Sequence, residues 1–137
     1  MRFFALRDAY VNRGQGALRR ILDRYMENNA QASEEVLDGL EAEFLSLLSR
    51  LVALFEGTPF RLPTTKRPSR PLYDALMIAL SVSPGLDIEA NARAICEALD
   101  RALGNPPEYD VLVGRGNTIE AVRERVDLAA QILQARA

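Results

Sequence analysis

The sequence predicts an all-α fold, a single-domain bundle of about six helices with a proline-rich connector between the third and the fourth. Apolar residues recur at spacings of three and four along most of the chain, which is the period of a helix with one buried face. No stretch alternates apolar and polar residues for long enough to build a sheet. Proline and glycine gather at a few places, and these separate the helical stretches from one another.

The longest helical pattern runs from Ser33 to Phe55. Its inward residues are Leu37, Leu40, Phe44, Leu47, Leu51 and Leu54, with Val36, Leu48, Val52 and Phe55 beside them. Ser33 can cap the first turn, and Gly57 with Pro59 can end the helix. Because the apolar stripe is so wide, we expect the rest of the chain to pack around this helix on two sides.

Two shorter helices precede it. Residues 2–11 predict a helix that has no capping residue before it, as expected of a helix that continues from an upstream segment. Its expected buried residues are Phe3, Phe4, Leu6 and Tyr10. Residues 17–28 predict a second helix, whose expected inward face is Leu18, Ile21, Leu22, Tyr25 and Met26.

The connector, residues 58–69, contains Pro59, Pro63 and Pro68, so we expect an extended segment that does not fold back easily. It divides the domain into residues 1–57 and residues 70–137. Ser69 can cap the fourth helix and Pro71 suits its first turn. That helix is apolar almost all round, which predicts a central position.

Residues 87–103 predict a fifth helix with a charged outer face, on which Arg93, Glu97 and Arg101 are spaced four apart. Residues 109–113 fit either a single helical turn or a short extended piece. Asn117, with Glu120 three residues later, resembles a capping box that opens the last helix. The expected inward residues of that helix are Ile119, Val122, Val126, Ala129 and Leu133.

Composition restricts the function more than it defines it. The 137 residues are 48% hydrophobic and 26% charged, with a net charge of −2, which is typical of a single globular domain. The chain has no histidine, which excludes Ser-His-Asp and Cys-His nucleophile pairs and His-ligated zinc. Cys96 is the single cysteine, which excludes an internal disulfide and favours the cytoplasm. We predict no catalytic residue, no metal site, no cofactor and no membrane segment.

Several segments together resemble the helical region that follows the ParB/sulfiredoxin-like domain in the GmrS-type family of restriction and phage-defence proteins. These segments are residues 2–7 with Tyr10, residues 22–29, Phe44, residues 54–61, residues 70–77, and residues 116–118 with Arg123 and Arg125. They are packing and turn patterns that cover nearly the whole chain.

The resemblance implies a helical module apart from its catalytic neighbour. The family's enzymatic motif, an Asp-Gly-Gln-Gln-Arg-like segment, belongs to the ParB-like domain, and a histidine-containing nuclease domain often follows downstream. Neither motif occurs in this sequence. We therefore expect a non-catalytic scaffold or interaction domain that binds the ParB-like domain, another protein subunit or a second copy of itself.

The alternative function is nucleic-acid binding by the connector, which carries Arg61, Lys66, Arg67 and Arg70 within ten residues. Several cations on a stiff loop suit a phosphate backbone, although such charges more often solvate a surface or pair with nearby acids. Residues 114–118 fit an anion-binding helix start less well than a plain turn with an N-cap. Cys96, beside an apolar helix face, is expected to be a small buried hydrophobe.

Overall fold

The computed structural model describes residues 2–12, 14, 16–55, 60, 62, 67–116 and 118–136. These residues form seven α-helices and one π-helical turn, and they contain isolated bridges but no strand. The elements are α1 (Arg2–Val11), α2 (Leu18–Asn28), α3 (Glu34–Leu54), α4 (Arg70–Ser81), α5 (Ala92–Leu103), α6 (Pro106–Tyr109), η1 (Asp110–Gly114) and α7 (Ile119–Leu133). The predicted all-α fold is confirmed.

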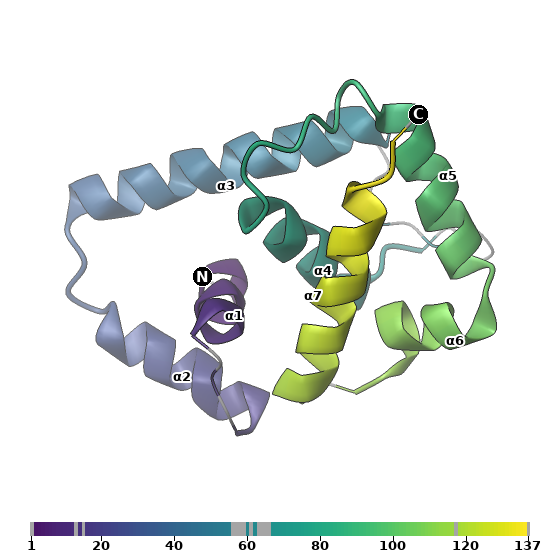
Figure 1. The fold of residues 1–137 in the computed structure, drawn as a ribbon. Coiled ribbons are helices and arrows are strands. Elements are labelled where there is room, and N and C mark those ends of the chain that lie inside the picture. The colour runs from purple at the N-terminus through teal and green to yellow at the C-terminus, as the bar shows by residue number, and fades with distance from the viewer. Residues whose placement is uncertain are drawn as a thin grey trace.

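Helix α4 forms the centre of the domain. Every residue from Asp74 to Leu80 is buried, and α4 packs against α1, α3, α7 and η1. Figure 1 shows α7 crossing α4, with α1 on one side and α5 and α6 on the other. The predicted central position of this helix is confirmed: a helix that is apolar almost all round is most stable when other elements cover all of its faces.

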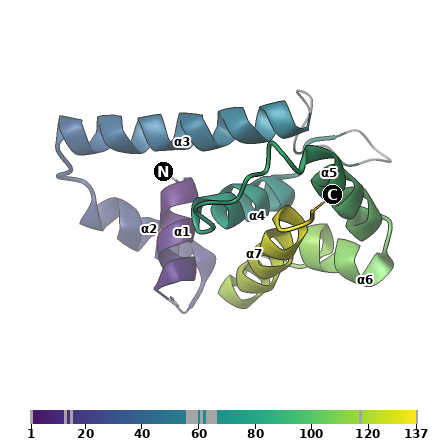
Figure 2. The ribbon, with the colours of Figure 1, turned by 45° about the horizontal axis from the view of Figure 1, so that its top comes forward.

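Helix α3 is the longest helix, but it is not the element around which the others pack. It runs along one edge of the molecule, and its N-terminal half extends past α4 (Figures 1 and 2). Of its residues only Leu51 and Leu54 are buried. The expectation of partners on two sides is therefore wrong for the N-terminal half, which leaves apolar side chains exposed. Met26 of α2, expected to point inward, is also 51% exposed.

Side-chain oxygens cap four of the helices: Asn105 caps α6, where its Oδ1 accepts from the backbone N–H of Glu108 at 3.4 Å, and three longer helices are capped in the same way. The Oγ atoms of Ser33 and Ser69 accept hydrogen bonds at 3.3 Å from the backbone N–H groups of Val36 and Leu72, as predicted. The last helix has Thr118 as its N-cap, one residue after the predicted position, and the Oγ1 of Thr118 accepts from the backbone N–H of Ala121 at 3.2 Å. Asn117 itself lies outside the described residues.

The fifth helix begins five residues later than predicted. The Asp87 side chain accepts a hydrogen bond from the backbone N–H of Ala90 at 3.0 Å, and the Asn91 amide donates to the Asp87 carbonyl at 3.0 Å. These contacts hold residues 87–91 in turns, because Asp and Asn side chains compete with the helical hydrogen bonds of the backbone. Residues 109–113, left open by the sequence, are helical and belong to α6 and η1.

The described part of the connector folds back on itself. The backbone N–H of Leu62 donates to the Arg67 carbonyl at 3.0 Å, and that of Ser69 donates to the Phe60 carbonyl at 2.7 Å. The Phe60 ring also packs edge-on against Tyr73 of α4, with ring centroids 4.8 Å apart. The expectation of a segment that does not fold back is wrong at these residues.

Candidate functional site

The basic connector residues predicted as a nucleic-acid site are only partly described. Arg67 and Arg70 are exposed and lie just before and at the first residue of α4. Arg61 and Lys66 lie outside the described residues. Of the four residues predicted to bind nucleic acid, the structure therefore describes two, and both lie on the surface near the start of α4.

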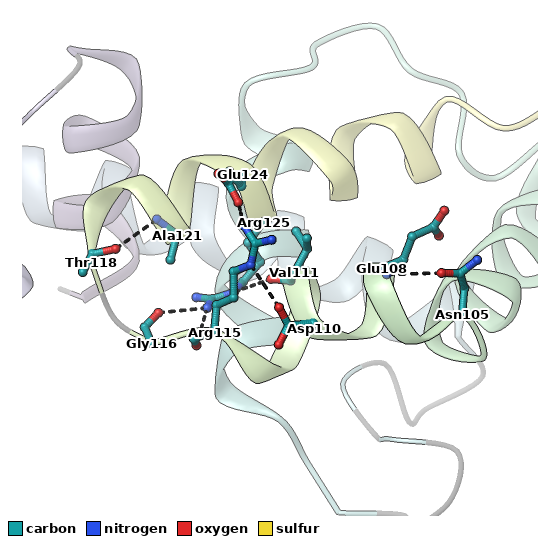
Figure 3. Close-up of polar contacts among 10 residues, drawn as sticks. All are labelled: Asn105, Glu108, Asp110, Val111, Arg115, Gly116, Thr118, Ala121, Glu124 and Arg125. Atoms are coloured by element: carbon teal, nitrogen blue, oxygen red, sulfur yellow. Dashed lines mark hydrogen bonds and ion pairs between the residues drawn. The ribbon is translucent and has the colours of Figure 1, made fainter.

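The segment at residues 114–118 directs carbonyl oxygens toward a buried arginine (Figure 3). Arg125 of α7 is 1% exposed. Its Nη2 donates to the carbonyls of Arg115 and Gly116 at 3.0 and 3.2 Å, and its Nε donates to the Val111 carbonyl at 3.3 Å. These contacts favour the turn interpretation over an anion site, because the groups turned inward are acceptors held by a cation.

A second layer of contacts ties η1 to α7 at the surface. The Arg115 guanidinium pairs with Asp110 at 3.1 Å and with Glu124 of α7 (Figure 3). A Cβ added at Gly114 would lie 2.7 Å from the Asp110 carboxylate, so a larger residue here would displace the Asp110 side chain. The cluster around Arg125 therefore joins two segments of the fold. Sequence reasoning missed this role, although buried Ala121 and Ala129 one turn on either side were a signal that Arg125 faces inward.

The buried carboxylate of Asp74 is held by a residue at the edge of the domain. Asp74 is 3% exposed, and the guanidinium of Arg2 donates to it from Nη2 at 2.8 Å and from Nε at 3.3 Å. Asp74 therefore has a structural partner in Arg2, whose side chain remains 30% exposed. The same carboxylate also acts on Arg125: burial lowers the pKa of the Arg125 guanidinium, and the negative charge of Asp74 opposes that shift.

Arg2 also lines a cavity of about 270 Å³ between α1, α3 and α4. The cavity is lined by Arg2, Phe3 and Phe4 of α1, by Leu37, Leu40, Glu41 and Phe44 of α3, and by Tyr73 of α4. Its walls are mostly apolar and aromatic, with one cation and one carboxylate. A cavity of this composition suits an apolar side chain of a partner or a small apolar ligand.

The cavity continues onto a largely apolar, partly exposed strip of α3, which we call the α3 flank. The flank consists of Leu37, Glu41, Phe44, Leu45, Leu48 and Val52, which a helix of 3.6 residues per turn places within a sector of roughly 100°. Leu37, Leu45 and Val52 are 43%, 51% and 37% exposed. The half-buried side chains of Phe44 and Leu48 lie between these three, and a connected apolar strip that is partly exposed marks an interaction site more often than single exposed residues do.

Among the residues that the structure describes, no three Asp, Glu or Cys side chains come together as a metal site. Cys96 is half-buried, and its Sγ contacts the Leu54 carbonyl at 3.4 Å, next to the end of α3. No described helix has both the length and the apolar character to cross a bilayer.

Comparisons with protein-family models, with curated proteins and with solved structures find no match to this chain. The resemblance to the GmrS-type family therefore stays a prediction. The candidate site that the geometry supports best is the α3 flank together with the adjoining cavity.

Proposed function

We propose that this chain is a helical protein-interaction domain that contributes a binding surface and no catalytic chemistry. The observation that carries the proposal is the α3 flank, where three apolar side chains are each more than one-third exposed and one of them, Leu37, also lines the mostly apolar cavity. Covering such a surface is favourable by about 25 cal/mol for each Å² of apolar area removed from water.

The flank lies on a helix that is already held in place at both ends. Helix α3 is capped at Ser33, and its C-terminal end is fixed by the buried side chains of Leu51 and Leu54. A partner therefore meets a preformed helix and does not have to order it, which lowers the entropic cost of binding. The cavity beside Leu37 and Phe44 offers a recess for one anchoring side chain of that partner.

The resemblance extends the proposal to a biological setting. We propose that the domain is the scaffold part of a restriction or phage-defence type protein, separate from the ParB-like domain that processes nucleotide or DNA. The ParB-like domain, another subunit or a second copy of this chain would then cover the α3 flank.

The test uses two single substitutions on adjacent exposed residues of α3. Leu45→Glu places a charge on the flank, whereas Ser46→Glu places the same charge on roughly the opposite side of the helix. Binding is measured by sedimentation velocity, first of the chain by itself and then with a ParB/sulfiredoxin-like domain of a GmrS-type protein. We expect association that Leu45→Glu weakens at least tenfold and Ser46→Glu leaves unchanged. No association in either experiment at 100 µM, an upper limit typical of weak specific binding, would contradict the proposal.

The alternative function, nucleic-acid binding by the connector, rests on the exposed side chains of Arg67 and Arg70. It predicts an affinity for duplex DNA that falls steeply with salt, because bound cations release counterions. Changing both residues to glutamine should then weaken binding and lower the salt slope by about two, one for each phosphate that is no longer neutralised. An unchanged salt slope would remove these residues from the nucleic-acid hypothesis.

A further inference from the structure

The arrangement of residues on the α3 flank identifies one occupant in particular. We infer that a second copy of this chain covers the flank, with the two α3 helices antiparallel and related by a two-fold axis between Phe44 and Leu45. This inference rests on the proposed function, because it names the partner of the same surface.

The flank is symmetric about its own midpoint. Phe44 and Leu45 are adjacent, Glu41 and Leu48 lie three positions further out on each side, and Leu37 and Val52 lie four positions further again. When a second α3 runs in the opposite direction, Leu37 of one copy lies opposite Val52 of the other. The same holds for Glu41 and Leu48 and for Phe44 and Leu45, so two of the three pairs are apolar on both sides, and the third sets the exposed side chain of Glu41 opposite Leu48. A two-fold interface requires such self-complementarity.

The distribution of charge on α3 selects the antiparallel direction. All five of its acidic residues, Glu34, Glu35, Asp38, Glu41 and Glu43, precede Phe44. From Phe44 to Phe55 the one ionisable residue is Arg50. Antiparallel pairing therefore sets each acidic half beside the acid-free half of the other copy, and the helix dipoles also oppose each other. Parallel pairing would set Glu41 of one copy directly against Glu41 of the other, which is unfavourable, whereas Glu43 is paired with Arg7 of its own chain in either direction.

The cavity beside the flank fits the same arrangement. Leu37, Glu41 and Phe44 belong both to the flank and to the lining of the cavity. A second helix on the flank would therefore lie over this side of the cavity, with Leu48 and Val52 of that copy nearest to it. Glu41 shares the lining of this cavity with Arg2, whose guanidinium is paired with Asp74.

The expected affinity is modest. Helix α3 has 21 residues and is roughly 31 Å long. One pair of helices of this length buries less than the about 800 Å² per partner of a standard interface. We therefore expect a dissociation constant of about 10–100 µM, which is typical of a weak specific dimer.

The first experiment is sedimentation equilibrium of the full chain at about 5–500 µM, a range chosen to bracket that constant. We expect a monomer–dimer equilibrium that Leu45→Glu shifts at least tenfold toward monomer and Ser46→Glu does not shift. Far-UV circular dichroism checks that each variant keeps its helix content. A wild-type chain that is monomeric at the highest concentration overturns the inference.

The second experiment determines the direction of pairing by disulfide crosslinking in a Cys96→Ala background. Chains carrying Leu37→Cys are mixed with chains carrying Val52→Cys under mild oxidation. Antiparallel pairing predicts the mixed disulfide, whereas Leu37→Cys chains that crosslink among themselves instead indicate parallel pairing and overturn the inference. A monomer that nevertheless binds a ParB-like domain through Leu45 would refute the second copy as occupant and leave the proposed function standing.

Discussion

The buried guanidinium of Arg125 gives the sharpest test of how this fold is held together. Arg125 is 1% exposed and holds three backbone carbonyls, those of Val111, Arg115 and Gly116, which belong to η1 and to the segment before α7. Arg125→Met keeps most of the side-chain volume but removes the charge and every donor. Arg125→Lys keeps the charge but replaces the planar fork of donors with a single ammonium group.

The magnitude follows from two opposing effects. Three hydrogen bonds from a charged donor are worth about 1.5–3 kcal/mol each. Removing the charge also relieves a desolvation penalty of several kcal/mol. We expect a net loss of about 3 kcal/mol for Arg125→Met, which lowers the melting temperature by about 10 °C for a chain of this length. Arg125→Lys should lose a similar amount, because an ammonium group cannot reach all three carbonyls from the same backbone position.

The assay is urea and thermal unfolding followed by far-UV circular dichroism at pH 7. The matched control is Arg93→Met, since the Arg93 side chain is 92% exposed on the surface of α5. This control should change stability by less than about 0.5 kcal/mol. If Arg125→Met lost under 1 kcal/mol, or if Arg125→Lys matched the wild type, the three carbonyl contacts would not stabilise the fold as argued.

Three further substitutions test local features of the fold. The hydroxyl of Tyr10 donates to Asp127 at 2.6 Å, and burial together with this hydrogen bond and the charge of Asp127 raises the pKa of Tyr10 to about 12. The folded state therefore holds this proton more tightly than the unfolded chain, so stability is full below pH 10 and falls as the pH rises toward about 12. Tyr10→Phe should flatten this alkaline loss in urea titrations, and an unchanged slope would show that Tyr10 is not its source. Gly39→Ala should stabilise the chain by about 0.5–1 kcal/mol, because an added Cβ has no atom within 4 Å and the position is inside α3. Gly85→Ala should destabilise by about 1–2 kcal/mol, because Gly85 has a φ of +86°; a stability change of the same sign in both glycine variants would contradict this reasoning.

Much of the fold could be predicted from local patterns in the sequence. The bounds of α1, the caps at Ser33 and Ser69, and the inward face of α7 all follow from short-range hydrogen bonding and helical periodicity. These features depend on residues within one or two turns of each other. Where nearby side chains competed with the helix, as Asp87 does before α5, the predicted boundary was wrong by several residues.

The candidate site depended on information that periodicity does not carry. The apolar stripe of α3 is visible in the sequence, but a stripe looks the same whether a helix packs inside its own chain or is left for a partner. The structure decided this, because α4, which is apolar almost all round, takes the centre and the N-terminal half of α3 is left at the edge. The role of Arg125 could not be predicted for the same reason, because its three carbonyl partners belong to η1 and to the turn between η1 and α7.

The sequence by itself determined that the chain is helical, where most of its helices begin and end, and that histidine-based chemistry is excluded. Only the tertiary structure decided which apolar faces are covered and which remain exposed. The physical reason is that helix formation depends on neighbours along the chain, whereas burial depends on which distant segments compete for the same interior.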